Sequence, residues 1–292
     1  MNLAEALRAA TEYLRERGVP SPRNDAELLL AGSLALGRAQ LYSEHDRELT
    51  DPEHARFDEL VERRGHREPL AYVLGTWGFR RLTLKVDARV LVPRPETEIV
   101  VEHCLELIRA LDRPRVLDVG TGSGAIALAI ADEHPGARVT AIDSSSAALE
   151  LAAENVAATG LGARLRLVEH DFHAGLALGG VFDLVVSNPP YVRPDEIESL
   201  EPEVRDWEPR AALVEEGAAD AVAAAGREPL AGGGWIVLEA ADGQARDLGK
   251  KLEEIGYVNV QSFPDLAGVE RGVLGEWQRS QRSSTHSERD GP

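Results

Sequence analysis

Apolar residues recur with two different periods along this chain. Over residues 1–75 they are spaced three and four apart, which is the repeat of one face of a helix. From Arg115 onward, short apolar runs of strand length alternate with longer helical patterns. The first part therefore predicts a small helical bundle, and the second predicts an α/β fold with a doubly wound, mostly parallel sheet.

The expected bundle has clear helix starts. Ser21-Pro22 and Thr50-Asp51-Pro52-Glu53 each combine an N-cap residue with proline in the first turn, and the second fits a capping box. Residues 76–92 change to the alternating period of strands, which predicts a two-stranded ribbon linking the bundle to the sheet. Composition alone leaves open whether residues 1–75 form a packing or lid module or a partner-recognition domain.

The second domain is predicted to span residues 93–277. Its expected strands are 115–119, 137–142, 165–170, 182–187 and 235–239, followed by a closing pair at 257–263 and 272–277 whose last member is compatible with an antiparallel direction. Residues 278–292 contain no large apolar residue, and we expect a disordered tail there.

Composition narrows the function classes. The formal charge of -18, from 50 acidic and 32 basic residues, argues against a partner held mainly through phosphates, so no direct nucleic-acid binding is expected. The single cysteine, Cys104, excludes an intramolecular disulfide framework and a cysteine-based metal cluster, and no metal is expected. No apolar run approaches ~18 residues and no cleavable leader is evident. We expect a cytoplasmic, monomeric protein without membrane contact.

A glycine-rich turn follows the first predicted strand of the sheet. Gly120, Gly122 and Gly124 alternate with Thr121 and Ser123. Glycine lets the backbone approach a ligand closely, although such a loop alone is a weak signal. The spacing differs from the Gly-x-Gly-x-x-Gly fingerprint of dinucleotide sites, and no Gly-Lys-Ser/Thr follows to hold a triphosphate.

The second and third predicted strands of the sheet end in residues that suggest an adenosine ligand. Asp143 follows Gly124 by 19 residues, where a carboxylate can accept hydrogen bonds from a ribose diol. Asp171 and Phe172 end the third strand, where a carboxylate can meet an exocyclic amine and an aromatic ring can cover an adenine face. Each is also compatible with an ordinary turn or core role. Together they favour S-adenosylmethionine over NAD as the cofactor.

The strand 182–187 stops on Asn188-Pro189-Pro190-Tyr191. The prolines hold Asn188 in extended backbone at the carboxyl end of a buried strand, where α/β sheets bind ligands. An amide or ring-amine nitrogen is a poor nucleophile because its lone pair is delocalised. The substrate nitrogen can donate its two N–H bonds to the side-chain carbonyl of Asn188 and the backbone carbonyl of Pro189, which leaves its lone pair facing a methyl donor. Tyr191 can stack on the planar group. Asn188, Pro189 and Tyr191 are thus the candidate catalytic residues, with Pro190 beside them.

Five segments carry a resemblance to a known family. Residues 116–124 and 187–191 are similar to class I methyltransferases that act on planar amino nitrogens, and residues 67–75, 90–98 and 203–210 resemble release-factor glutamine methyltransferases of the HemK type. The resemblance spans residues 3 to 277.

The resemblance implies S-adenosylmethionine-dependent methylation of the glutamine in the Gly-Gly-Gln motif of peptide chain release factors. It implies cofactor contacts at Gly120 to Gly124, Asp143, Phe172 and Asn188, and substrate contacts across Asn188 to Tyr191. It also places Arg94 to Thr97 at the entrance to the active site, with Arg94 and Glu96 as substrate contacts, and favours a docking role for residues 1–75.

Two segments depart from the family pattern. They are 238–244, with Ala240 and Ala241 after Glu239, and 215–220, which lacks a glycine-rich turn. Neither is expected to touch Asn188 to Tyr191.

Three alternatives remain open from the sequence. A DNA or RNA adenine methyltransferase shares the Asn-Pro-Pro-Tyr logic but needs a basic groove. The sequence distinguishes a glutamine methyltransferase for another translation protein less clearly from one for release factors. A non-catalytic binding module is disfavoured by the intact glycines, Asp143 and Asn188. The preferred release factor and the placement of the bundle over the site are not determined by the sequence.

Overall fold

The N-terminal helices follow the predicted pattern. The computed structural model describes residues 1–278, so the expected tail lies outside the described residues apart from Gln278. The helices of this region are α1 (Leu3–Glu16), α2 (Pro22–Leu34), α3 (Arg38–Ser43), α4 (Asp51–Gly65) and α5 (Leu70–Leu74). Leu14, Leu29 and Phe57 are at most 1% exposed and form the core between α1, α2 and α4. A helical bundle is therefore confirmed.

Caps define where these helices begin. The Thr50 N–H donates to the Glu53 carboxylate at 2.9 Å, which is one half of the expected capping box. A second box, which the sequence analysis did not identify, joins Asn2 and Glu5 at the start of α1. Ser21 is the N-cap of α2 as predicted but makes no side-chain cap hydrogen bond. Helix α3 was not predicted, because only Leu41 of its six residues is buried and no periodic stripe marks it.

The predicted ribbon is present but shorter than expected. Strands β1 (Thr76–Phe79) and β2 (Leu82–Lys85) pair antiparallel, with Thr76 opposite Lys85. Residues 86–92 are irregular, so the predicted end at 92 was wrong. Val86 and Val92 are buried against Ala71 and Tyr72 of α5, and Val90 is buried against α8 (Ser146–Thr159). Their apolar pattern therefore reflects burial of a loop and not strand pairing.

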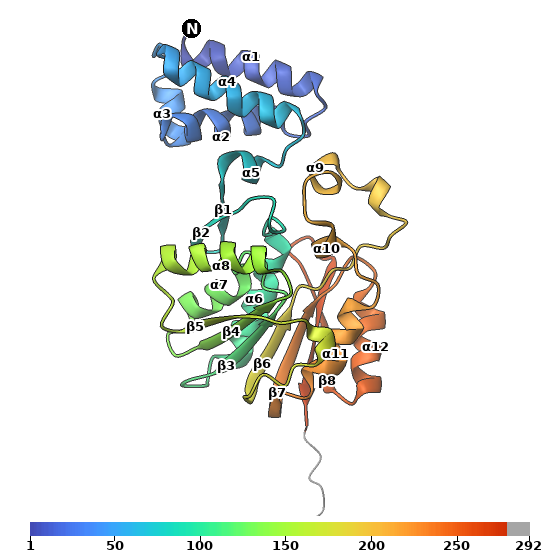
Figure 1. Cartoon of the computed structure of the whole chain (residues 1–292). Helices are drawn as coiled ribbons and strands as arrows, with labels where there is room; N and C mark the ends of the chain where they lie inside the picture. The colour runs from blue at the N-terminus through green and yellow to red at the C-terminus, as the bar shows by residue number, and fades with distance from the viewer. Residues whose placement is uncertain (279–292) are drawn as a thin grey trace, which may run out of the picture.

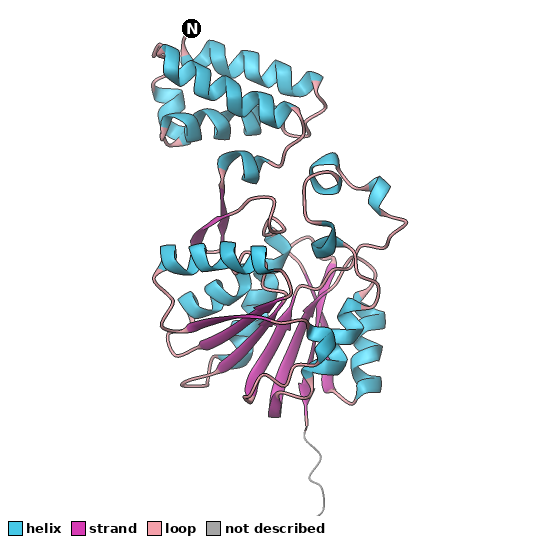
Figure 2. Ribbon diagram, viewed as in Figure 1, coloured by secondary structure: helices cyan, strands magenta, loops and turns pink. Residues whose placement is uncertain are grey.

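A seven-stranded sheet forms the second part of the chain, in the order β5-β4-β3-β6-β7-β9-β8 (Figures 1 and 2). The strands are β3 (Arg115–Val119), β4 (Arg138–Asp143), β5 (Leu165–Glu169), β6 (Phe182–Ser187), β7 (Leu230–Glu239), β8 (Val258–Pro264) and β9 (Glu270–Trp277). Strands β3 to β7 are parallel, and β9 runs antiparallel to both β7 and β8. The doubly wound, mostly parallel sheet is thus confirmed. The chain order reverses between β3 and β6, and the carboxyl ends of strands at such a switch point are the expected ligand site.

Helices cover both faces of the sheet, as Figure 1 shows. Helices α6 (Pro95–Ile108), α7 (Ala125–Glu133) and α8 lie on one face, and α11 (Ala218–Gly226) and α12 (Ala245–Ile255) lie on the other. Along β6, Leu184 and Val186 pack in one apolar cluster and Val185 packs in the other. This two-sided burial explains why the apolar residues from Leu184 to Val186 of β6 are consecutive and do not alternate with polar ones.

The crossover from β6 to β7 reaches back toward the N-terminal helices. It contains η2 (Ile197–Ser199), α9 (Pro202–Arg205) and α10 (Arg210–Leu213), and Figure 1 shows it rising beside α5. Arg64, at the end of α4, contacts Glu203 of α9 at 2.7 Å and Asp25 of α2 at 2.8 Å. Arg67 binds the same Glu203 through two nitrogens, at 2.6 and 2.8 Å. Two of the segments that carry the family resemblance therefore meet here as an ionic cluster.

In the part of the chain described by the structure, no helix combines the length and the apolar character needed to cross a membrane.

Candidate active site

The glycine turn between β3 and α7 takes a backbone shape that only glycine adopts easily. Gly120, Gly122 and Gly124 have φ of 73°, 53° and 82°. A Cβ on Gly120 or Gly122 would meet no protein atom within 4 Å, so both face open space, whereas one on Gly124 would press on Leu128. The turn is held to β4 because the Gly120 and Thr121 N–H groups both donate to the Ile142 carbonyl at 2.9 Å.

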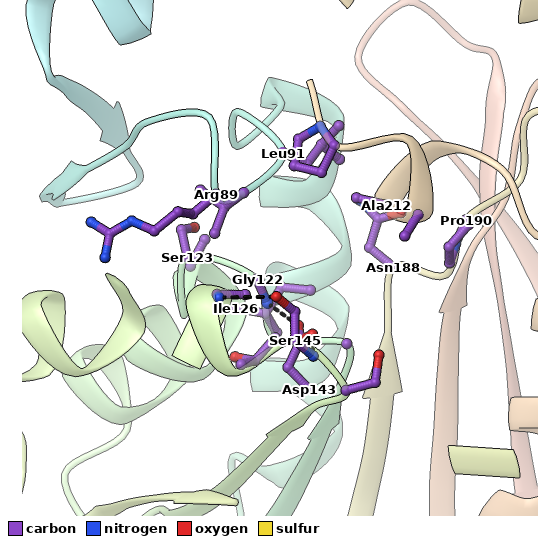
Figure 3. A pocket seen from close by; sticks show the side chains of 18 of the residues that line it. Arg89, Leu91, Gly122, Ser123, Ile126, Asp143, Ser145, Asn188, Pro190 and Ala212 are labelled. Atoms are coloured by element: carbon purple, nitrogen blue, oxygen red, sulfur yellow. Dashed lines mark hydrogen bonds between the residues drawn. The ribbon is translucent and has the colours of Figure 1, made fainter. Parts of the chain in front are cut away.

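Asp143 ends β4 beside this turn. Its two carboxylate oxygens accept N–H bonds from Gly122 and Ser145, each at 2.9 Å (Figure 3). Each oxygen keeps a further lone pair for a ligand. The carboxylate is thus fixed in place by the backbone with acceptor capacity left for a ribose diol.

Replacing Asp143 by alanine should weaken cofactor binding about 10- to 100-fold, or about 1.5–3 kcal/mol. The change removes the acceptor for the diol and leaves the Gly122 and Ser145 N–H groups unpaired. Calorimetric titration with S-adenosylmethionine measures this loss, and Asp143→Asn, which keeps one acceptor oxygen, should lose less. An unchanged Kd in the alanine variant would remove Asp143 from the cofactor site.

One cavity of about 1100 Å³, open mouth included, lies at the carboxyl ends of β3, β4 and β6. Nine of the predicted site residues line it: Gly120, Thr121, Gly122, Ser123, Asp143, Phe172, Asn188, Pro190 and Arg94. Five others do not, namely Gly124, Asp171, Pro189, Tyr191 and Glu96. The structure therefore brings most of the proposed cofactor contacts together.

The five residues outside the lining have identifiable surroundings. Gly124 is the N-cap of α7. Asp171 is exposed and accepts the His173 N–H at 2.9 Å, so it caps the short helix η1 (Phe172–Ala174). Pro189 is buried, and Tyr191 lines a neighbouring hollow that shares Pro190 with the cavity. Glu96 is half-buried in the first turn of α6.

Both arginines of the cavity are already paired with carboxylates. Arg94 donates to both oxygens of Glu208 at 2.7 Å, and Arg89 pairs with Asp87 and Glu154. Glu208 is buried, and this burial raises its pKa although Arg94 opposes the effect. Paired arginines are poorly suited to bind a pyrophosphate. The glycine turn, Asp143 and the ring of Phe172 instead suit an adenosine with a small zwitterionic tail, as in S-adenosylmethionine.

Asn188 lies at the carboxyl end of β6. The Ser187 hydroxyl anchors this end by donating to the Val119 carbonyl of β3 at 2.7 Å. The Asn188 amide donates through Nδ2 to the Thr97 hydroxyl of α6 at 3.2 Å. The Oδ1 atom therefore remains as an acceptor for a substrate.

Tyr191 follows the two prolines with a neutral ring. Burial raises the pKa of its phenol to about 12, with the nearby Glu239 contributing. Its carbonyl accepts a bond from the Gln244 amide at 3.3 Å. Tyr191 is thus suited to stacking and not to proton abstraction at neutral pH.

One departing segment does contact the element from Asn188 to Tyr191, contrary to the expectation, and the other lines the cavity. Gln244 belongs to the segment 238–244 and contacts Tyr191 directly. Glu215 lines the cavity and binds the His173 ring. Loops distant in sequence meet at the sheet edge, so a sequence comparison by segment could not reveal these contacts.

Two buried acidic residues at the site, Asp118 and Glu239, were not identified from the sequence. Burial raises the pKa of Asp118 to about 7, and its carboxyl accepts a 2.6 Å hydrogen bond from the Thr121 hydroxyl. Burial likewise raises the pKa of Glu239, at the end of β7, to about 7. Thr97, the last residue of the predicted entrance segment, lines the cavity and is 4% exposed beside Asn188. The positions of the two acidic residues in the sequence could have identified them, because Asp118 lies within a central strand and Glu239 ends one.

Two family models match the chain. The PrmC N-terminal domain matches residues 5–75, and the methyltransferase small domain matches residues 97–206. A solved 16S rRNA N2 methyltransferase from T. thermophilus, in complex with AdoMet and guanosine, has a TM-score of 0.52 at 20% identity and covers 70% of this chain and 50% of its own. At this identity the likeness shows the fold.

Curated relatives match almost the whole chain. The release factor glutamine methyltransferase of Chlorobaculum tepidum is 40% identical over 284 residues, which cover 93% of this chain and 96% of the relative. That of Deinococcus radiodurans is 42% identical over 279 residues, covering 94% and 98%. The chain therefore belongs to the family of release factor glutamine methyltransferases.

Proposed function

We propose that this protein transfers a methyl group from S-adenosylmethionine to the side-chain amide nitrogen of the glutamine in the Gly-Gly-Gln motif of peptide chain release factors. The observation that carries the proposal is the Asn188 amide, held at the end of β6 beside the glycine-turn cavity. Family membership over more than nine-tenths of the chain supports the substrate class.

The cofactor side of the site is assigned to the glycine turn, Asp143 and Phe172. When bound there, S-adenosylmethionine supplies an electrophilic methyl group on a sulfonium. Gly120 and Gly122 carry no Cβ and would let the ligand approach the backbone closely, and Asp143 would accept hydrogen bonds from its ribose hydroxyls. Apolar side chains, Ile126 and Ile142 among them, line the same cavity.

The acceptor side is assigned to Asn188 through Tyr191. Asn188 Oδ1 and the Pro189 carbonyl accept the two N–H bonds of the substrate amide, and the Tyr191 ring stacks on its plane. This arrangement holds the nitrogen lone pair in line with the methyl donor. A strong base is not required, because the nitrogen becomes acidic once the methyl is attached and releases its proton to water.

The test is methyl transfer from labelled S-adenosylmethionine to three acceptors. Purified protein should label intact release factor and should label neither its Gln→Ala variant nor DNA. The DNA arm addresses the adenine-methyltransferase alternative, which shares the Asn-Pro-Pro-Tyr element. Label on DNA, or label that persists on the Gln→Ala factor, would contradict the proposal.

Residues 1–75 are proposed to dock the release factor, which deletion of residues 1–65 can test. The shortened chain keeps α5, whose Ala71 and Tyr72 support the cavity loop at Val90 and Val92. It should therefore lose most methylation of intact factor while its cofactor Kd changes much less. A short Gly-Gly-Gln peptide, which cannot reach the bundle, should be methylated similarly by both chains. Equal losses in cofactor binding and in methylation would count against docking.

A further inference from the structure

The Thr97 hydroxyl and the Glu239 carboxyl form a polar floor beneath Asn188. Thr97, in the first turn of α6, accepts the Asn188 Nδ2–H bond. Burial raises the pKa of the Glu239 carboxyl, and the Thr97 hydroxyl and the Asn188 amide lie near enough for each to lower it. Thr97 is 4% exposed and Glu239 is 2% exposed, so both side chains are almost fully buried.

This floor matters because an asparagine amide has two edges of similar shape. With Oδ1 turned toward the substrate, Asn188 accepts a hydrogen bond from the substrate N–H. With Nδ2 turned toward it, two hydrogen-bond donors face each other and no bond forms. Shape alone does not choose between the two orientations. The choice depends on the groups that the inner edge of the amide meets.

Glu239 biases that choice. Its Oε2 makes no hydrogen bond within the described part of the chain, so the carboxylate retains acceptor capacity. An ionised carboxylate only accepts, and it draws the Thr97 hydroxyl proton toward itself. The Thr97 oxygen is then left to accept from Asn188. A flipped amide would instead set Oδ1 against two acceptors in a dry environment, which is costly.

We propose that Thr97 and Glu239 are positioning residues that hold the Asn188 amide with Oδ1 toward the methyl-accepting nitrogen. The inference rests on the proposed function, since it concerns the orientation of the same clamp. Thr97 lines the cavity next to Asn188 and Glu239 does not, and neither residue is assigned a contact with the substrate or the cofactor.

Burial places the ionisation of Glu239 in the neutral pH range. Burial raises the pKa of its carboxyl, Glu96 of α6 adds to the rise, Arg271 of β9 opposes it, and the net pKa is about 7. The neutral Tyr191 phenol lies nearby. Below pH 7 the protonated carboxyl can donate to Thr97, which frees the Thr97 hydroxyl to donate to Oδ1 and favours the flipped amide. The rate of transfer should therefore rise with pH through about 7 and level off above it.

The first test removes the hydroxyl while keeping the shape. Thr97→Val should lower kcat for release factor about 10- to 100-fold with KM and cofactor Kd changed less than about threefold, and Thr97→Ser should restore most of the rate. The matched control is Thr11→Val, at a buried threonine of α1 whose hydroxyl bonds only within its helix. The control should keep the wild-type kcat.

The second test replaces the Glu239 carboxyl with a group that does not titrate. Glu239→Gln keeps an acceptor for Thr97, so this variant should retain measurable activity and lose the rise in kcat through pH 7. A wild-type kcat in Thr97→Val, failure of Thr97→Ser to restore the rate, or an unchanged pH profile in Glu239→Gln would each overturn the inference. If Thr97→Val does not fold, the Glu239→Gln profile decides. Wild-type protein that fails to methylate release factor would instead defeat the proposed function itself.

Discussion

Replacing Asn188 by alanine should reduce methyl transfer to release factor about 10²- to 10³-fold while cofactor binding stays within about threefold of the wild type. The variant lacks the proposed acceptor that holds one substrate N–H bond, so the nitrogen lone pair is no longer aligned with the methyl donor. The glycine turn and Asp143 do not depend on this side chain, because Ile142, Gly122 and Ser145 hold them. Single-turnover transfer of label and calorimetric cofactor titration measure the two quantities separately.

Asn24→Ala is the matched control for this experiment. Asn24 is exposed in the first turn of α2, far from the cavity in sequence and outside its lining. The control should keep both the rate and the cofactor Kd. Retained turnover in Asn188→Ala would refute the lone-pair argument, and a parallel loss of cofactor binding would show that Asn188 acts mainly on the cofactor.

Replacing Arg64 by alanine should lower the free energy of unfolding by about 3–5 kcal/mol. The Arg64 side chain is 5% exposed, and its partners Asp25 and Glu203 are 7% and 14% exposed. Removing one member of a buried ionic cluster leaves uncompensated charge, and here Asp25 loses the arginine that faces it at 2.8 Å. Arg67 still pairs with Glu203, so the larger part of the loss should arise at Asp25. Denaturant titration at neutral pH measures the effect.

Arg15→Ala provides the comparison for an exposed pair. The Arg15 and Glu12 side chains are 57% and 61% exposed, and such pairs contribute about 0–1 kcal/mol. The control should thus stay within about 1 kcal/mol of the wild type. A loss below about 1 kcal/mol in Arg64→Ala as well would mean that the cluster is hydrated and not a structural link.

This cluster connects the N-terminal helices to the crossover that frames the acceptor side of the cavity. Glu203 lies between β6 and β7, in the same segment as Glu208, which pairs with Arg94 at the cavity. Trp207 lies between these two glutamates in the sequence, and its side chain packs against the apolar cluster that contains Tyr72 and Val92. The segment therefore touches both the bundle and the site, which supports the proposed role of residues 1–75 in presenting the substrate.

Much of the fold could be predicted from local patterns. Strands β3 and β6 have the predicted bounds because each carries consecutive apolar residues, as is typical of a strand buried on both faces, and a turn signal follows it in the sequence. The loop 86–92 was mistaken for strand because buried loop positions repeat with a similar spacing. Helix α3 was missed because a six-residue helix with one buried side chain leaves no periodic signal.

The sequence by itself determined three features: the division into a helical bundle and an α/β domain, the glycine turn, and the strand end on which Asn188 lies. Each of these depends on residues adjacent in the chain, through turn chemistry, proline restrictions and apolar period. Only the tertiary structure decided what surrounds Asn188. Thr97 and Glu239 come from α6 and β7, 91 and 51 positions away, and Gln244 reaches Tyr191 from the turn before α12. Their meeting results from parallel strands ending at one edge of the sheet, and no local pattern records that alignment.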